Sequence, residues 1–417
     1  MLQRAMIRLN FNSDDKQQSQ TSIQLPASKS ISNRLSIIQA LSQNELNIQN
    51  WSDAEDSRLM REILSSNSSE VDARMAGTVI RFLTAYFALQ DGKEVVLKGA
   101  ERMHQRPIAP LVEALKELGA DIEYLKKDGF PPLKIKGAKL KGKKLSIDAS
   151  MSSQFVTALL LIAPYLENGI QLELFNPSSI PYIDMTLSLM KMCGISCERD
   201  KNAIKVEEGS YQLSTPYTIE PDWSSAAFFY QFFALSDMEE LKIEGLQPNS
   251  LQGDRKCAEL FEMLGVKTDF TEAGVELRRT NLANKEIELD LSGQPDLILP
   301  FVFAGIFLLP SLRIKGIQTL RIKESDRVEA LLSELQKLAK IEYDLSEDEI
   351  YLKLIDKNPD SELRMLSSHN DHRIAMSIAP LTLLFPSLEL DDEQVVDKSF
   401  PDFWRQIEKL EVHLSKA

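Results

Sequence analysis

The sequence predicts an α/β protein built of two similar domains. Its 417 residues exceed the length that one hydrophobic core usually serves, so two domains are the default expectation. The chain also repeats itself, because a helix, a turn and two short strands recur at a period of 71 to 75 residues. Similarity at a fixed period indicates repeated supersecondary units.

The first repeated segment is an amphipathic helix followed by a strand pair. Its apolar residues fall at i, i+3, i+4 and i+7, and an alternating pattern with β-branched residues follows the turn. We expect Gly119, Gly194 and Gly265 to form the helix C-terminal turn in three copies, with Ala339 in the fourth. The four copies occupy residues 107–137, 181–209, 254–279 and 326–354.

The second repeated segment is a polar loop of small residues that leads into a nearly all-apolar helix. It occurs six times, at residues 28–41, 74–89, 150–164, 221–235, 294–309 and 369–384. Markers in the last five copies are 75, 72, 72 and 76 residues apart, but Lys29 precedes Gly77 by only 48, so the first unit must be shortened or split.

A helix that is apolar on every side is buried, so its N-terminus is where polar chemistry emerges. Six such N-termini with free N–H groups are six potential anion sites. Their serines could equally be ordinary N-caps, and for Ser224 and Ser225 both interpretations stay open.

Basic residues gather in or near these loops. They are Lys29, Arg34, Arg81, Arg106, Lys323, Arg327, Arg373 and Lys398. Any one of them could be a solvated surface charge, but cations at a helix start are unfavourable unless an anion also lies there. Since arginine and lysine together suit phosphate and carboxylate groups, their recurrence predicts one site for a small substrate with several negative charges.

Acidic residues accompany these cations. The segment KESDR places Glu324 and Asp326 between Lys323 and Arg327, and Asp296 begins another apolar helix. Two interpretations stay open. The acids either form local ion pairs at a helix start, which stabilise little, or supply a carboxyl group for proton transfer.

Charge and cysteine content exclude several classes of function. A net charge of −14 argues against nucleic-acid or anionic-membrane partners. Three cysteines fit a reducing compartment without disulfides, and Cys193 and Cys197 lack the further ligands of a metal site. The N-terminus resembles neither a signal nor a transit peptide, and the longest apolar stretch, residues 297–310, fits a buried core helix better than a membrane span.

Nine short motifs then point to one family. They are LPASKSISNR, AGTVIRFL, QRPIAPLVEALKELGA, SMSSQFVTALL, IPYIDMT, EPDWSSAA, RIKESDR, NDHRIAM and KSFPDFW. From about Leu25 to Trp404 the chain resembles the 3-phosphoshikimate 1-carboxyvinyltransferases (EPSP synthases), with every motif in family order.

The resemblance implies a fold and a division of the chain. Each of two similar domains would contain three βαβαββ units with buried helices, an inside-out α/β barrel, and the active site would lie in the interdomain cleft. Residues 21–220 would form the N-terminal domain, on the side of shikimate 3-phosphate, and residues 1–20 plus 221–417 the C-terminal domain.

The resemblance also implies a reaction without cofactor or metal. The enolpyruvyl group of phosphoenolpyruvate would pass to the 5-hydroxyl of shikimate 3-phosphate through a tetrahedral ketal, and phosphate would leave. The residues that match the family's ligands of shikimate 3-phosphate are Lys29, Ser30, Arg34, Ser152, Ser153, Gln154, Ser179, Tyr182, Asp296 and Lys323.

The second substrate and the catalytic groups are implied in the same way. The residues that match the ligands of phosphoenolpyruvate are Lys29, Gly77, Arg106, Gln154, Arg327, Arg373 and Lys398. Asp296 matches the acid that orients the attacking hydroxyl and is expected to deprotonate it, and Glu324 matches the candidate proton donor to the methylene carbon. Lys29, Lys323 and His372 complete the expected catalytic set.

Two alternative functions compete with this one. A UDP-N-acetylglucosamine enolpyruvyl transferase relies on a loop cysteine, which residues 99–110 lack. A non-catalytic polyanion-binding relative would gain nothing from Asp296 and Glu324. We expect a cytoplasmic monomer. The chain departs from the family at Arg74-Met75, which usually reads Gly-Asn, and at Trp223, where a small residue is usual.

Overall fold

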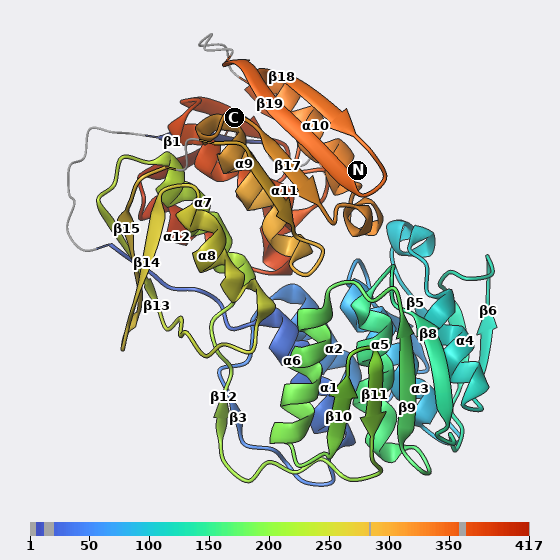
Figure 1. Ribbon diagram of the computed structural model, residues 1–417. Helices are drawn as coiled ribbons and strands as arrows, with labels where there is room; N and C mark the ends of the chain where they lie inside the picture. Colours follow the sequence, from blue (N-terminus) through green and yellow to red (C-terminus); the bar gives the residue numbers. More distant parts are fainter. Residues whose placement is uncertain (1–5, 12–20, 283–284, 358–363, 417) are drawn as a thin grey trace. The chain divides into compact units, whose positions relative to one another are not determined.

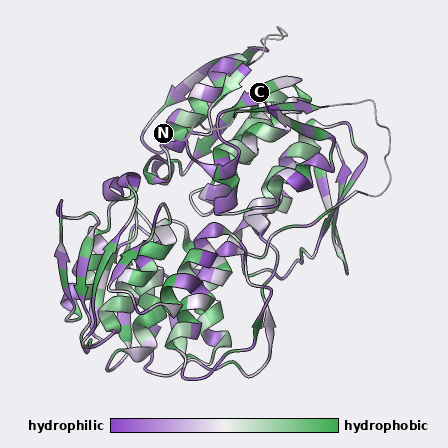
Figure 2. Ribbon diagram, turned by 180° about the vertical axis from the view of Figure 1, so that it is seen from behind, coloured by the Kyte–Doolittle hydropathy of each residue, from purple (hydrophilic) through white to green (hydrophobic). Residues whose placement is uncertain are grey.

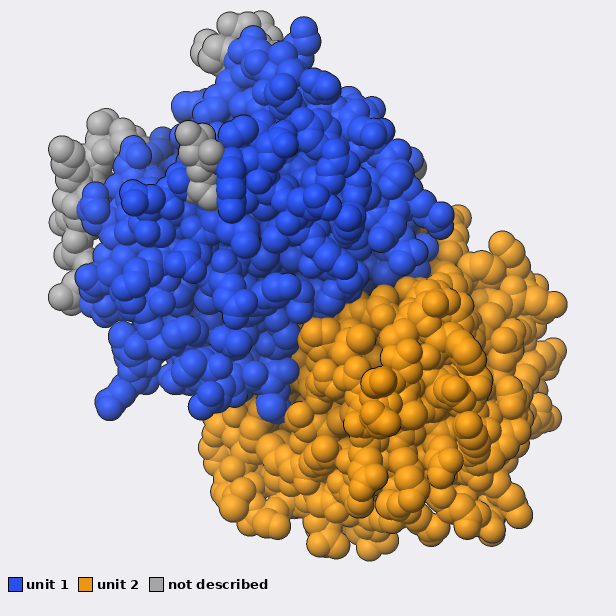
Figure 3. All heavy atoms as spheres, viewed as in Figure 1, with its two compact units in different colours: residues 1–26, 220–417 blue, residues 27–219 orange. Residues whose placement is uncertain are grey.

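Helices and short sheets alternate along the chain in the computed structural model, which describes residues 6–11, 21–282, 285–357 and 364–416 (Figure 1). The chain divides into two compact units, coloured separately in Figure 3. Unit 1 consists of Met1–Pro26 and Glu220–Ala417, and unit 2 of Ala27–Ile219. Mixed helices and sheets confirm the predicted α/β class.

Unit 2 contains two complete βαβαββ repeats. In each repeat the first two strands are parallel, because a helix joins them, and the last two form an antiparallel hairpin. The sheet orders are β4-β5-β7-β6 and β10-β11-β9-β8. The first repeat comprises β4 (Glu70–Asp72), α3 (Gly77–Leu89), β5 (Glu94–Lys98), α4 (Ala109–Glu117), β6 (Asp121–Tyr124) and β7 (Leu133–Lys136). The second comprises β8 (Lys144–Asp148), α5 (Ser153–Ile162), β9 (Ile170–Phe175), α6 (Ile180–Met192), β10 (Cys197–Asp200) and β11 (Ala203–Val206).

The remaining part of unit 2 is split between its two ends. It comprises α1 (Lys29–Leu41), β3 (Ile48–Gln49), α2 (Glu55–Ser65) and, far along the chain, β12 (Tyr217–Thr218). β12 pairs with β3 in parallel, and these two strands form a two-stranded sheet. The prediction of a shortened or split first unit is confirmed for the described residues, since β3 and β12 come from opposite ends of this part of the chain. Only 48 residues separate Lys29 from Gly77, which leaves too little chain for a full repeat.

Unit 1 contains three four-stranded sheets. Their orders are β14-β15-β13-β2, β16-β17-β19-β18 and β20-β21-β1-β22. The first sheet and its two helices are β2 (Ser22–Ile23), α7 (Trp223–Leu235), β13 (Glu240–Glu244), α8 (Cys257–Glu262), β14 (Val266–Thr271) and β15 (Gly274–Arg279). The second sheet and its two helices are β16 (Ile287–Asp290), α9 (Ile298–Leu308), β17 (Leu312–Lys315), α10 (Arg327–Leu338), β18 (Ala339–Leu345) and β19 (Glu349–Lys357). The third sheet and its two helices are β1 (Ile7–Phe11), β20 (Arg364–Leu366), α11 (His372–Ile378), β21 (Ser387–Leu390), α12 (Phe403–Glu408) and β22 (Val412–Lys416).

Both ends of the chain meet in the last of these sheets. β1 lies between β21 and β22 and is antiparallel to each, with Leu9 opposite both Leu388 and Leu414. The N-terminal strand therefore completes a sheet whose other strands come from the C-terminal part of the chain.

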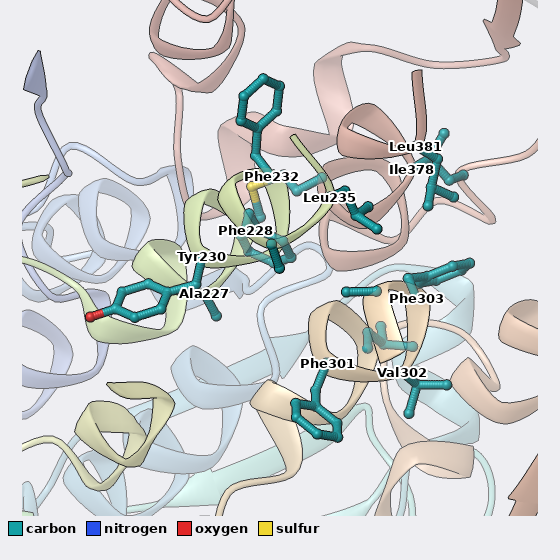
Figure 4. Packing of buried hydrophobic residues seen from close by; sticks show 14 of the residues in the cluster. Ala227, Phe228, Tyr230, Phe232, Leu235, Phe301, Val302, Phe303, Ile378 and Leu381 are labelled. Carbon is teal, nitrogen blue, oxygen red and sulfur yellow. The ribbon is translucent and has the colours of Figure 1, made fainter. Parts of the chain in front are cut away.

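The six apolar helices predicted from the sequence are α1, α3, α5, α7, α9 and α11. Every residue of α7 is buried, and so is every residue of α9 except its last, Leu308. Figure 4 shows Phe228 of α7 and Val302 of α9 among the side chains of one cluster, and Figure 2 shows the ribbon coloured by hydropathy, with hydrophobic residues in green. Residues 297–310 thus contain a buried core helix, as expected. Within the described residues, helices of the length and hydropathy required for a membrane span are absent.

Glycine ends three of the amphipathic helices in the predicted manner. Gly119, Gly194 and Gly265 adopt φ values of +107°, +84° and +79°, which favour glycine at this position. The prediction for Ala339 is wrong, because its φ is −153° and it is already the first residue of β18. Alanine carries a Cβ that makes the left-handed turn costly, and α10 passes directly into the strand.

Candidate functional site

The predicted site residues fall into two groups, one in each unit. Unit 2 carries Lys29, Ser30, Arg34, Gly77, Arg106, Ser152, Ser153, Gln154, Ser179 and Tyr182. Unit 1 carries Asp296, Lys323, Glu324, Arg327, His372, Arg373 and Lys398. Most of these residues lie at or next to the N-terminus of a helix.

The first residue of α1, Lys29, is paired with an acid that the sequence analysis did not single out. Its Nζ lies 3.3 Å from Oδ2 of Asp56, the second residue of α2, and the two side chains are 15% and 7% exposed. The Ser28 hydroxyl caps α1 by accepting from the Ile31 amide at 3.4 Å. The ammonium group is therefore held at the helix start, where a substrate anion would meet both the N-terminal dipole and a cation.

Arg34, one turn further along α1, is buried and connects two of the predicted residues. Its Nη1 donates to the Ser30 carbonyl at 2.8 Å and its Nη2 to the Tyr182 carbonyl at 3.1 Å. Burial lowers the pKa of Arg34 to about 10. At neutral pH this guanidinium is still a cation.

Gln154, at the start of α5, has both ends of its amide fixed. Its Oε1 accepts from Arg81 Nη1 at 2.7 Å, and its Nε2 donates to Thr78 Oγ1 at 3.0 Å. The Ser152 hydroxyl caps the same helix by accepting from the Gln154 amide at 3.2 Å. Ser153 follows in the first turn and is 6% exposed. A hydrogen-bonded group of polar side chains, formed by Arg81, Gln154 and Ser152, thus links α3 and α5.

Gly77 and Arg106 are in close contact. A Cβ added at Gly77 would lie 2.7 to 2.9 Å from the guanidinium atoms of Arg106, which is closer than real Cβ contacts. Arg106 is 5% exposed. Glycine at the first position of α3 therefore leaves the space that the guanidinium occupies.

Ser179 precedes α6 in an unusual backbone conformation. Its φ of +52° and ψ of +42° are left-handed, which costs energy for a residue with a Cβ. Its carbonyl accepts from the Tyr182 amide at 3.1 Å. Left-handed non-glycine residues are concentrated at functional sites, so this conformation supports the predicted site at Ser179.

The charged cluster of unit 1 is centred on Arg327, which is 2% exposed. Its Nε and Nη2 donate to the two carboxylate oxygens of Asp371 at 2.8 and 3.2 Å. Nη1 donates to Asp296 at 3.2 Å, and Nη2 also donates to Glu324 at 3.1 Å. Burial alone would lower the pKa of Arg327, but the carboxylates of Asp371, Glu324 and Asp296 together raise it.

Asp296 and Glu324, the two predicted catalytic acids, are both held by cations. Asp296 Oδ2 accepts from Arg373 Nη2 at 2.7 Å, so its carboxylate bridges Arg373 and Arg327. Glu324 Oε1 lies 3.9 Å from Lys398 Nζ. The structure thus brings the two acids and three of the predicted cations together within one unit.

The two other predicted residues of this unit lie beside the cluster. His372 is 1% exposed, and its Nδ1 lies 3.6 Å from Asp371 Oδ1. Lys323 directly precedes Glu324 and is partly exposed.

A further buried acid, Asp254, was not predicted. It is 2% exposed, and the Ser224 hydroxyl donates to its Oδ2. Burial and, second, the charge of Asp296 raise the pKa of Asp254 to about 7, although the Ser224 hydrogen bond and the charge of Arg373 act in the opposite direction. Asp222 caps α7 by accepting from the Ser225 amide, and the Ser224 hydroxyl binds Asp254 instead.

One of the acids that were missed, Asp371, could have been found from the sequence. Asp371 lies inside the NDHR motif, where only His372 and Arg373 were singled out. Asp56 and Asp254 lie outside the nine motifs, and their burial is visible only in the folded chain. Cys193, Cys197 and Cys257 are buried, as expected for core residues, and the described residues contain no cluster of potential ligands that could hold a metal ion.

The arrangement suits substrates with several negative groups. Each unit places cations at helix starts, and in unit 1 carboxylates occupy the guanidinium donors. A phosphate or carboxylate of a substrate can replace a protein carboxylate at such donors. The displaced protein carboxylate is then able to accept a proton.

Comparison with known proteins gives the family. The family model for EPSP synthase (3-phosphoshikimate 1-carboxyvinyltransferase) matches residues 62–407. A 3-phosphoshikimate 1-carboxyvinyltransferase of Bacteroides fragilis is 41% identical over 394 residues, which are 94% of this chain and 95% of that protein. One from Histophilus somni is 34% identical over 421 residues, covering 93% and 96% of the two chains.

Solved structures agree in fold. The EPSP synthase from Acinetobacter baumannii superimposes with a TM-score of 0.76 at 20% identity, covering 99% of this chain and 100% of that one. The enolpyruvyl transferase NikO from Streptomyces tendae gives a TM-score of 0.74 at 12% identity, covering 99% of each chain. The match over residues 62–407 and the identity to the curated relatives together show that the chain belongs to the EPSP synthase family.

Proposed function

We propose that the chain transfers the enolpyruvyl group of phosphoenolpyruvate to the 5-hydroxyl of shikimate 3-phosphate, with release of phosphate. The observation that carries this function is the match to the EPSP synthase family over most of the chain. It agrees with the activity that the sequence motifs predicted, and it does not favour the UDP-N-acetylglucosamine enolpyruvyl transferase.

The first substrate is assigned to unit 2. Lys29 and Arg34 supply positive charge for shikimate 3-phosphate, and the helix starts near Ser30, Ser152 and Ser179 supply hydroxyls and N–H groups. Ser153 and Tyr182 complete the polar lining, and the fixed amide of Gln154 lies at the same helix start as Ser152. Asp296 and Lys323 of unit 1 are the remaining proposed contacts.

The second substrate is assigned to cations of both units. Arg106 and Lys29 belong to unit 2, and Arg327, Arg373 and Lys398 belong to unit 1. Gly77 leaves room at the Arg106 guanidinium. A phosphate and a carboxylate together offer enough acceptors for several arginine forks, so we propose that both clusters act on the same pair of substrates.

The hydrogen bonds of Asp296 suggest how it becomes a base. Without substrate its carboxylate is held by Arg327 and Arg373, and this pairing weakens its basicity. Phosphoenolpyruvate would offer its own anionic oxygens to the same two guanidinium groups. Asp296 would then be left to orient the 5-hydroxyl and take its proton.

The complementary proton comes from Glu324. Protonation of the methylene carbon produces cationic character at the neighbouring carbon, which the hydroxyl oxygen attacks to form the tetrahedral ketal. The ketal then loses a proton from its methyl group and expels phosphate, which regenerates the double bond. Lys29, Lys323 and His372 are proposed to stabilise charge around these atoms, so fixed charges and positioning supply the catalysis.

Phosphate release from the wild-type chain tests this function. With phosphoenolpyruvate and shikimate 3-phosphate together we expect one phosphate per enolpyruvyl group transferred, and with either compound alone none. Release with UDP-N-acetylglucosamine in place of shikimate 3-phosphate would favour the rival transferase. Binding of both substrates without release would favour the non-catalytic relative.

Three further features remain proposals. Unit 2 and unit 1 would be the N-terminal and C-terminal enolpyruvyl transferase domains, divided near residues 21 and 221. The chain would act as a monomer. Its site of action would be the cytoplasm.

A further inference from the structure

Arg34 is held by two buried threonines, Thr157 and Thr186, which lie inside the motifs SMSSQFVTALL and IPYIDMT but were given no role there. Its Nε donates to Thr186 Oγ1 of α6 at 2.8 Å, and its Nη2 approaches Thr157 Oγ1 of α5 at 3.5 Å. Both threonines are 0% exposed, and Arg34 is 3% exposed. The guanidinium of α1 therefore connects three helices through hydroxyl groups.

The direction of the hydrogen bonds follows from the chemistry of a hydroxyl, which has one proton to donate. Thr186 uses its proton on the Tyr182 carbonyl, at 2.8 Å. The 3.2 Å contact between the two threonine hydroxyls is then donated by Thr157. With both protons used in this way, both hydroxyl oxygens present lone pairs to Arg34.

The acceptors of Arg34 are all neutral. Besides the threonines they are the carbonyl oxygens of Ser30 and Tyr182. Among the described residues no carboxylate forms an ion pair with Arg34, and aromatic rings of Phe82 and Tyr182 lie 5.7 and 6.0 Å from its guanidinium carbon. Neutral acceptors fix the direction of a guanidinium without cancelling its charge.

We propose that Thr157 and Thr186 are positioning residues, which hold the Arg34 guanidinium in place as an uncompensated cation for the anion of the first substrate. The four hydrogen bonds of Arg34 use four of its five N–H donors, and the fifth, on Nη1, remains for a substrate oxygen. A carboxylate partner would orient the side chain equally well, but it would compete with the substrate for this charge. The proposal rests on the proposed function only for the identity of that substrate.

Replacing the Thr186 hydroxyl by a methyl group tests the proposal with little change of volume. In Thr186→Val we expect the Kd and the KM of shikimate 3-phosphate to rise about tenfold or more, as for loss of a hydrogen bond to a charged group. We expect kcat and the KM of phosphoenolpyruvate to change less than about threefold. Thr157→Val should act in the same direction but more weakly, because its contact is longer.

A matched control and a rescue variant separate positioning from stability. Thr84 is also 0% exposed, but its hydroxyl donates to the Ile80 carbonyl of its own helix at 2.7 Å. Thr84→Val should lower the melting temperature to a similar degree and leave the Kd of shikimate 3-phosphate unchanged. Thr186→Ser keeps the hydroxyl and should restore the Kd to within about threefold of the wild-type value.

Calorimetry with shikimate 3-phosphate and turnover of the wild-type chain distinguish the possible failures. If the wild-type chain turns over and Thr186→Val binds shikimate 3-phosphate within about twofold of wild type, the positioning role is wrong and the proposed function stands. If Thr84→Val weakens binding as much as Thr186→Val does, the effect is one of packing and the proposal also fails. If the wild-type chain neither binds nor converts shikimate 3-phosphate, the proposed function fails first and the positioning role with it.

Discussion

Asp371 binds Arg327 with both of its carboxylate oxygens, at 2.8 Å from Nε and 3.2 Å from Nη2. Both side chains are almost completely buried, at 0% and 2% exposure. Asp371 also caps α11 by accepting from the Arg373 amide at 3.0 Å. One carboxylate thus orients the start of α11 and the central cation of the unit 1 cluster. Arg327 and Arg34 are therefore opposite cases, since carboxylates surround the first and neutral oxygens the second.

Asp371→Asn should destabilise unit 1 and reduce activity together. Arg327 would lose the partner that binds it through two carboxylate oxygens and would keep single contacts to Asp296 and Glu324, so we expect the free energy of unfolding to fall by about 3 kcal/mol. We expect kcat/KM for phosphoenolpyruvate to fall at least 100-fold, because Arg327 loses its orientation. Denaturant unfolding and steady-state kinetics measure the two effects.

Glu389→Gln is the matched control for Asp371→Asn. Glu389 is a largely buried carboxylate of the same unit that binds Arg8 at 2.8 Å, and Arg8 is 42% exposed. This pair is partly solvated, so its loss should cost less than about 1 kcal/mol and leave the kinetics unchanged. Equal effects of the two substitutions on stability and on kcat/KM would contradict a special role for Asp371.

Gly77→Ala should act through Arg106. The new Cβ would meet the guanidinium at 2.7 to 2.9 Å, so the Arg106 side chain has to move. We expect the KM of phosphoenolpyruvate to rise about tenfold or more and the Kd of shikimate 3-phosphate to change less than about threefold. In Gly209→Ala, the control in the same unit, the nearest atom is the flexible Cδ1 of Ile195 at 3.2 Å. An unchanged KM in Gly77→Ala would show that Arg106 does not bind this substrate.

Asp254→Asn should change the pH dependence of stability. Burial raises the pKa of Asp254 from 3.8 to about 7, so the folded state binds a proton that the unfolded state has released between these two values. Asp254 therefore makes the wild-type chain less stable as the pH rises through this interval, and the asparagine variant lacks this loss.

The difference in the free energy of unfolding between Asp254→Asn and the wild type should thus grow in favour of the variant as pH rises. Between pH 5.5 and 8 the growth should be about 2 kcal/mol, at 1.36 kcal/mol per pKa unit. The charged groups that act on Asp254 are Asp222, Asp296 and Arg373, and they are present in both proteins. A difference that does not change with pH would show that Asp254 is ionised throughout.

Lys29→Ala and Glu324→Gln should separate binding from proton transfer. Lys29 is assigned to both substrates, so its loss should raise both KM values about tenfold or more. Glu324 is assigned to proton transfer, so Glu324→Gln should mainly lower kcat, by about 100-fold or more. Steady-state kinetics with each substrate varied in turn measure the split. Equal losses of affinity in both variants would count against Glu324 as the proton donor.

The buried helices were predictable because their pattern is local. A helix that follows a polar loop and is apolar on every side is expected to be buried, and α7 and α9 confirm this. Glycine at a helix end was predictable for the same reason, through the left-handed φ of Gly119 or Gly265. The prediction for Ala339 failed because it relied only on the place of this residue in the repeat. Alanine lacks the conformational freedom that lets glycine adopt a left-handed φ.

The partners of the charged residues could not be predicted, because they depend on packing between distant segments. Asp371 is 44 residues from Arg327 and Thr186 is 152 residues from Arg34. Arg74 shows the same limit. Its φ of +48° is one that favours glycine, the residue that the resemblance led us to expect at this position. Arg74 compensates with hydrogen bonds to Asp72 at 2.8 Å and Glu55 at 2.7 Å.

The most direct test of enolpyruvyl transfer follows the wild-type chain with both substrates in D₂O by ³¹P and ¹H NMR. We predict that one inorganic phosphate appears for each phosphoenolpyruvate consumed, that the phosphate on the shikimate ring is retained, and that deuterium enters the methylene group of the product. Deuterium enters because the methylene carbon gains a solvent-derived proton before the ketal loses one. Phosphate release without a vinyl ether product, or product whose methylene group stays free of deuterium, would contradict the account.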